Sequence, residues 1–170
     1  MASSLSPDNA SNSRLRFQRC AATLRCEPVD RAPAYIPAIA CDVSSAILGR
    51  TAYTGTGSVR YAEVAAWARG EAAHAEFEAQ LIEDLVEIHR VLDVDVLRMP
   101  WRMNERPDAQ LDQYTFRFGP ESGEHTIWQY TPATADFSPV YESPRLDPPE
   151  VRLRKRLVHL EKIAADPMPQ

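Results

Sequence analysis

The feature that most constrains this chain is a helical pattern that runs directly into an apolar segment. Every third or fourth residue is apolar along one stretch: Phe77, Leu81, Leu85, Ile88 and Leu92. This spacing predicts an amphipathic helix within residues 60–92, bent at Gly70, with its acidic side chains on a solvated outer face. Residues 94–99 follow at once and are apolar enough for a buried strand. A helix that covers a buried strand is typical of an α/β fold.

Upstream, the pattern predicts a helix, a strand and a second, short helix. The first helix is expected over residues 14–25 and the strand over residues 34–39, although prolines flank and interrupt the strand. Asp42 is expected to cap a short helix over residues 43–48, and Gly49 is expected to end it in the left-handed conformation. The order of elements so far is helix, strand, helix, helix, strand.

Downstream, aromatic and polar residues alternate in two segments that a glycine-rich turn separates. Residues 114–118 and 126–131 are therefore predicted to form a β-hairpin around the turn at 119–123. The proline-rich residues 132–149 are expected to be an extended connection. An Asp-x-x-Glu capping box then predicts an amphipathic helix over residues 149–165.

Composition narrows the class of protein. The formal net charge of -5 over 170 residues argues against a nucleic-acid or anionic-membrane binder, because such proteins need a basic surface. No apolar run approaches the roughly 20 residues of a membrane-spanning helix. The three cysteines have no Cys-x-x-Cys spacing, which favours reduced thiols and a cytoplasmic location.

Polar and aromatic residues at the end of the second predicted strand mark a candidate binding site. Arg98, Trp101 and Arg102 lie where the carboxyl end of that strand is expected. Guanidinium groups there can bind a carboxylate or a phosphate, and the indole can form a flat wall. The alternative is that both arginines extend to solvent or pair with Glu105 and Asp108, and we give the two interpretations equal weight.

A second group of polar residues has the spacing of metal ligands, but the evidence for a metal site is weaker than that for the binding site above. Glu71, His74 and Glu78 share one face of the long predicted helix, because three- and four-residue steps bring side chains together. No second cluster supplies further ligands of the usual kinds. We therefore interpret His74 as a surface histidine among glutamates, and expect no metal site within this chain.

Three segments resemble the uroporphyrinogen decarboxylase superfamily. They are an arginine-bearing helix within residues 14–33 that runs into Leu-Arg-Cys-Glu-Pro-Val-Asp-Arg-Ala-Pro, the helix-to-strand passage at residues 92–96, and the hairpin at residues 118–132. The resemblance implies a (β/α)8 barrel about twice as long as this chain. We therefore expect the N-terminal half of a TIM-type barrel with an inserted β-hairpin, made of a disordered tail at 1–13 and one partial barrel domain at 14–170.

The resemblance also implies a substrate-binding surface and a branch of the superfamily. The surface would consist of Cys41, Asp42, Arg98, Trp101 and Arg102, whereas no catalytic residue is identified. The decarboxylases carry Met-Arg-Gln-Ala-Gly-Arg where this chain has Ile-Ala-Cys-Asp-Val-Ser, and their catalytic aspartate aligns with a stretch, Met-Pro-Trp, that has no acid. This pattern favours the corrinoid- or thiol-dependent methyltransferases.

The functional hypotheses differ in how the missing half of the barrel is accounted for. In the methyltransferase branch the zinc ligands lie in the carboxyl-terminal half, so zinc and a corrinoid would belong to a complete enzyme. An active form would be methyltransferase-like or decarboxylase-like and would need that half, with an anionic small molecule as ligand. The alternatives are a non-enzymatic remnant, a subunit that completes its barrel with a second copy or a complementary chain, and a porphyrinogen carboxy-lyase.

Overall fold

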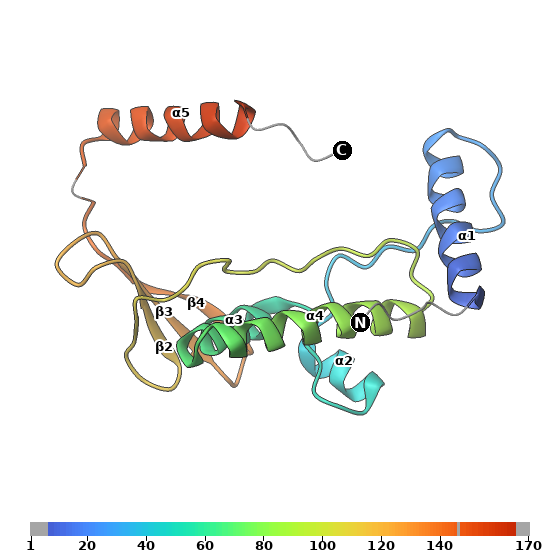
Figure 1. Cartoon of the computed structure of the whole chain (residues 1–170), viewed down its shortest axis with the longest axis horizontal. Helices are drawn as coiled ribbons and strands as arrows, with labels where there is room; N and C mark the ends of the chain where they lie inside the picture. The colour runs from blue at the N-terminus through green and yellow to red at the C-terminus, as the bar shows by residue number, and fades with distance from the viewer. Residues whose placement is uncertain (1–6, 146, 166–170) are drawn as a thin grey trace.

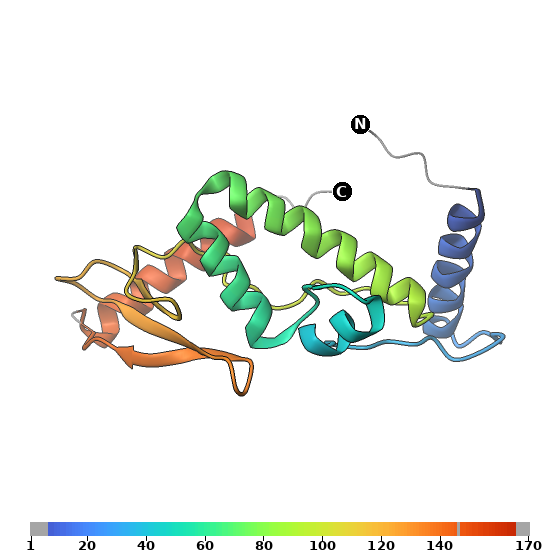
Figure 2. The same cartoon turned by 90° about the horizontal axis from the view of Figure 1, so that it is seen from below.

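The computed structural model describes residues 7–145 and 147–165, and within them the fold is mixed α/β (Figure 1). The helices are α1 (Pro7–Leu24), α2 (Cys41–Leu48), α3 (Thr56–Arg69), α4 (Glu71–Val91) and α5 (Pro149–Ala165). The strands are β1 (Ala109–Gln110), β2 (Thr115–Phe118), β3 (Thr126–Thr131) and β4 (Asp136–Glu142). The sheet lies at one end of the long helix α4 and α1 lies at the other, as both views show (Figures 1 and 2).

Helices α3 and α4 form the centre of the molecule and meet at Gly70, whose φ of 117° breaks the helix as predicted. The predicted stripe of α4 is buried at Phe77, Leu81, Leu85 and Ile88. Its last predicted member is not, because α4 ends at Val91 and Leu92 is exposed.

One acidic residue of α4 departs from the predicted solvated face. Asp84 is fully buried and accepts hydrogen bonds from the Arg50 side chain and, at 2.7 Å, from the backbone N–H of Tyr53. A carboxylate can be buried when a cation and hydrogen-bond donors contact it. Here the donors come from the loop between α2 and α3, whose position the hydrophobic periodicity of α4 does not predict. Asp84 therefore ties the loop before α3 to α4.

Helix α1 begins at Pro7, earlier than the start predicted at residue 14. Residues 7–13 of the predicted tail are therefore part of α1, whereas residues 1–6 lie outside the described residues. No other proline occurs before Pro28, so the helix can run without a break.

The sheet is antiparallel, with strand order β1-β2-β3-β4. The predicted hairpin is confirmed, because β2 pairs with β3 with Phe116 opposite Trp128. The predicted extended connection is partly a strand, since β4 pairs with β3. Pro139 is accommodated in β4 because this is an edge strand and the register shifts next to its partner Trp128. The ring of Phe137 packs with Val64 of α3, which joins the sheet to the helices.

The two predicted buried strands are extended segments joined by a single parallel bridge, between Tyr35 and Val96. Residues 94–99 are buried only at Val94, with Leu97 and Met99 exposed. In the described residues no further strand lies beside either segment, and a parallel strand is buried only between neighbours. The half-barrel prediction is therefore not confirmed.

A buried carboxylate holds these two segments together. Asp95 accepts hydrogen bonds from Arg19 of α1, from Arg31 at 2.6 Å and from the backbone N–H of Ala34 at 2.8 Å. Burial of Asp95 opposes ionisation, but these donors outweigh it, so the pKa of Asp95 is lower than its usual 3.8. The carboxylate is charged at neutral pH and anchors α1 and the first extended segment to the second.

We expect Asp95→Asn to destabilise the protein by about 1–3 kcal/mol at pH 7, because the charge-assisted bonds to two arginines are lost. Since the folded-state pKa is lowered, the contribution of Asp95 is complete well above the usual pKa of 3.8 and is lost as the pH falls through the lower folded-state pKa. Urea unfolding of both proteins at pH 7 and pH 3 measures this. A difference that does not shrink at pH 3 would contradict it.

Candidate functional site

The structure divides the five predicted binding residues among three places. Arg98 and Trp101 line a cavity of about 360 Å³, whereas Cys41 and Asp42 line another of about 440 Å³. Arg102 lines neither and lies in a buried ion pair. We call the first the arginine cavity and the second the tyrosine cavity.

The arginine cavity lies at the carboxyl ends of both extended segments. Pro37 and Ala38 contribute from the first segment, and Arg98, Pro100 and Trp101 contribute from the second. The Arg98 guanidinium carbon lies 5.3 Å from the centre of the Trp101 ring, a cation–π contact. Both side chains are solvent-exposed, Trp101 by 78%. Among the described residues no carboxylate pairs with Arg98, so its charge is available to an anion.

Helix α3 supplies the opposite wall of the arginine cavity. Thr56 and Gly57 line it from the first turn of α3, and Arg60 lines it one turn later. The amides of a first turn carry a partial positive charge, and here no cap side chain binds them. Arg60 lies 3.9 Å from Asp136, which also lines the cavity. In the opposite wall, Arg98 has no carboxylate partner among the described residues.

Gly57 is required where α3 meets the sheet. A Cβ atom at this position would lie 2.5 Å from the carbonyl oxygen of Ala135 and 2.6 Å from the amide nitrogen of Phe137. The adjoining Thr56 has a φ of 69°, a left-handed conformation that is strained for a β-branched residue. Close packing on β4 thus sets the position of the first turn of α3 beside the cavity.

Arg102 fixes the loop that carries Arg98 and Trp101. Its guanidinium donates to the fully buried carboxylate of Glu63 at 2.9 and 2.6 Å and to Glu78 at 2.7 Å. The other oxygen of Glu63 accepts the backbone N–H of Met103 at 2.8 Å. Burial opposes the charge on Arg102, but the two carboxylates outweigh it and raise the pKa of Arg102; its hydrogen bond lowers the pKa of Glu78.

His74 is part of the same cluster and is buried, so its interpretation as a surface histidine is wrong. Its ring stacks on Trp67 with 3.6 Å between centroids, and its Nε2 atom lies 3.4 Å from Arg102. The physical reason is that α3 packs against this face of α4, which the pattern of α4 alone does not reveal. No group of three or more His, Cys, Asp or Glu side chains within residues 7–145 and 147–165 could hold a metal ion.

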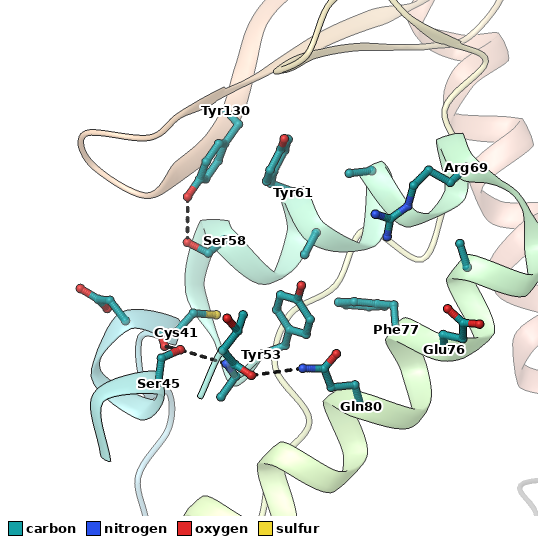
Figure 3. A pocket seen from close by; sticks show the side chains of 16 residues that line it. Cys41, Ser45, Tyr53, Ser58, Tyr61, Arg69, Glu76, Phe77, Gln80 and Tyr130 are labelled. Carbon is teal, nitrogen blue, oxygen red and sulfur yellow. Dashed lines mark hydrogen bonds between the residues drawn. The ribbon is translucent and has the colours of Figure 1, made fainter. Parts of the chain in front are cut away.

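The tyrosine cavity lies between α2, α3, α4 and β3 (Figure 3). Cys41 and Asp42 lie in the first turn of α2, so Asp42 is not the N-cap that the pattern predicted; Ala40 is. The Cys41 thiol donates to the carbonyl oxygen of Gly55 at 3.3 Å, and burial raises its pKa. A thiol of raised pKa is protonated at neutral pH and is a poor nucleophile.

Several residues of both cavities were missed from the sequence. Arg60 is one helical turn from Glu63, and the sequence of α3 does not show that Arg60 lines a cavity whereas Glu63 is buried against Arg102. In the tyrosine cavity the missed residues are Tyr53, Tyr61 and Arg69. Arg69 could have been found, because Ser58, Ala62, Ala65 and Arg69 recur at helical spacing, with small side chains at the two middle positions.

Comparison with known proteins identifies no relative: no protein-family model, curated protein or solved structure gives a significant match. Within the described residues, no helix combines the length and the apolar character needed to cross a membrane.

We expect Arg102→Gln to destabilise the protein by about 3–5 kcal/mol, because it leaves the carboxylate of Glu63 buried without its cation. The double variant Glu63→Gln/Arg102→Gln removes both charges and should recover part of this loss. Arg90→Gln, at an exposed arginine of α4, is the matched control. Urea unfolding measures all three, and a loss for Arg102→Gln no larger than that of the control would refute the argument.

Proposed function

We propose that this chain binds an anionic small molecule in the arginine cavity. The observation that carries the proposal is the guanidinium of Arg98, which has no carboxylate partner among the described residues and stacks on Trp101 beside Arg60 and the first turn of α3. Arginine suits carboxylate and phosphate groups because its planar fork donates two parallel hydrogen bonds. The exposed indole of Trp101 offers a flat apolar surface to the rest of the ligand.

We further propose that the chain belongs to an α/β barrel like those of the uroporphyrinogen decarboxylase superfamily. Two observations support this. The bridge between Tyr35 and Val96 is parallel, as between neighbouring barrel strands, and the arginine cavity lies at the carboxyl ends of the segments that this bridge joins. In such barrels the ligand binds at that end.

For the reaction, we propose methyl transfer rather than decarboxylation. The support is that residues 99–101, Met-Pro-Trp, contain no carboxylic acid, and that Arg102 is engaged by Glu63 and Glu78. The described residues supply ligand binding and no metal site, so we assign no chemical step to zinc or to a corrinoid.

The anion proposal is tested by calorimetric titration with benzene-1,3,5-tricarboxylate, a planar anion. We expect Arg98→Gln to weaken binding by about tenfold or more, because a charge-assisted hydrogen bond contributes about 1.5–3 kcal/mol. Arg106→Gln, at an exposed arginine outside the cavity, is the control and should leave the affinity unchanged. Equal affinities for the two variants would remove Arg98 from the site.

A second candidate function is that of a subunit that completes its barrel with another chain or a second copy. The exposed stripe of α5, which includes Leu153, Leu157 and Leu160, favours it. Figure 1 shows α5 apart from the other helices and the sheet. Exposed apolar stripes of this kind commonly mark contact surfaces.

We expect the purified chain to self-associate at micromolar concentration and Leu153→Gln/Leu157→Gln to reduce the association. Size-exclusion chromatography with light scattering measures the mass. A cooperatively melting monomer would overturn the version in which a second copy completes the barrel. Arg154→Gln, a charge change on the same helix, is the control.

A further inference from the structure

The tyrosine cavity is formed by two facing helical stripes. The stripe of α3 has small side chains in its middle and consists of Ser58, Ala62, Ala65 and Arg69. The facing stripe of α4 consists of Ala73, Phe77 and Gln80. Steps of three and four residues keep each set on one face of its helix. Alanines at the middle positions leave open a slot that extends for about three helical turns.

Aromatic rings line this slot on two sides. Tyr53 and Phe77 lie with 5.3 Å between their ring centroids, and Tyr61 stacks on Tyr130 at 4.1 Å with 8° between the ring planes. The Tyr130 hydroxyl is 3.1 Å from the Ser58 hydroxyl, which fixes one end of the slot. These two aromatic pairs present flat apolar surfaces to the slot, which suit the ring of an aromatic ligand.

The polar groups at the other end determine which ligand fits. Among the described residues Arg69 forms no ion pair, and Figure 3 shows its guanidinium turned toward the rings. Glu76 of α4 also lines the cavity, so the charges at this end have both signs. The hydroxyl of Tyr53 forms no hydrogen bond within the described part of the chain and is open to a ligand. These groups offer a ligand a cation and a hydroxyl beside apolar aromatic surfaces.

We propose that the tyrosine cavity binds a small aromatic monocarboxylate, with its ring between Tyr53 and Tyr61 and its carboxylate on Arg69. The volume of about 440 Å³ lies in the range of small-molecule sites. A hydroxyl on the ring can bond Tyr53 or Ser58. This site is distinct from the arginine cavity and does not depend on the function proposed for it.

Calorimetric titration with 3-(4-hydroxyphenyl)propionate tests the proposal. We expect Arg69→Gln to weaken binding by about tenfold or more, because the carboxylate loses its charged donor. Arg90→Gln is the matched control, since both arginines lie in the last turn of a helix. Ala65→Leu should block the slot, and thermal unfolding of each variant verifies that it is folded. Arg106→Gln, at an exposed arginine outside both cavities, should also leave this affinity unchanged.

Two analogues, one uncharged and one of opposite charge, test the role of the carboxylate. 4-Ethylphenol should bind more weakly than the acid, and tyramine more weakly still, because its ammonium faces Arg69. Tighter binding of tyramine would make Glu76 the counter-charge and overturn the assignment. Absence of binding by all three compounds, or binding that a folded Ala65→Leu variant retains, would overturn the site itself.

Discussion

The buried carboxylate of Glu63 is the group on which the described structure depends. It lies in the middle of α3, is fully buried, and accepts both Arg102 and the backbone of Met103. A charge in that position is stable only while its donors stay in place, since an unpaired buried carboxylate is strongly destabilising. The loop that returns from α4 to the sheet is therefore held on α3 at one point by an ion pair.

This ion pair also determines which arginine of the loop can contact a ligand. Arg102 is engaged by Glu63 and Glu78, whereas Arg98, four residues earlier, has no carboxylate partner among the described residues. The ion pairs of Arg102 with Glu63 and Glu78 hold the loop so that Arg98 and Trp101 lie near the first turn of α3. Two arginines that look equivalent in the sequence thus have different roles, one in holding the loop and one in presenting a charge.

Local patterns were sufficient for much of the secondary structure. The break at Gly70 and the hairpin around residues 119–123 depend on near neighbours in the chain, through backbone freedom and alternation. Patterns failed where distant partners decide the outcome. β4 formed in a proline-rich stretch because β3 offers an edge, and residues 94–99 stayed largely exposed because the described residues place no second neighbour beside them.

The sequence by itself determined the mixed α/β character, the main helices and the presence of an arginine and tryptophan at the end of an extended segment. Tertiary structure alone decided how the candidate residues are grouped: Arg98 with Trp101, Cys41 with Asp42, and Arg102 with Glu63. Periodicity reports which face of one element is apolar, whereas grouping depends on which elements pack together. The pairing of Arg102 with a residue 39 positions away is the clearest case, because no local pattern contains it.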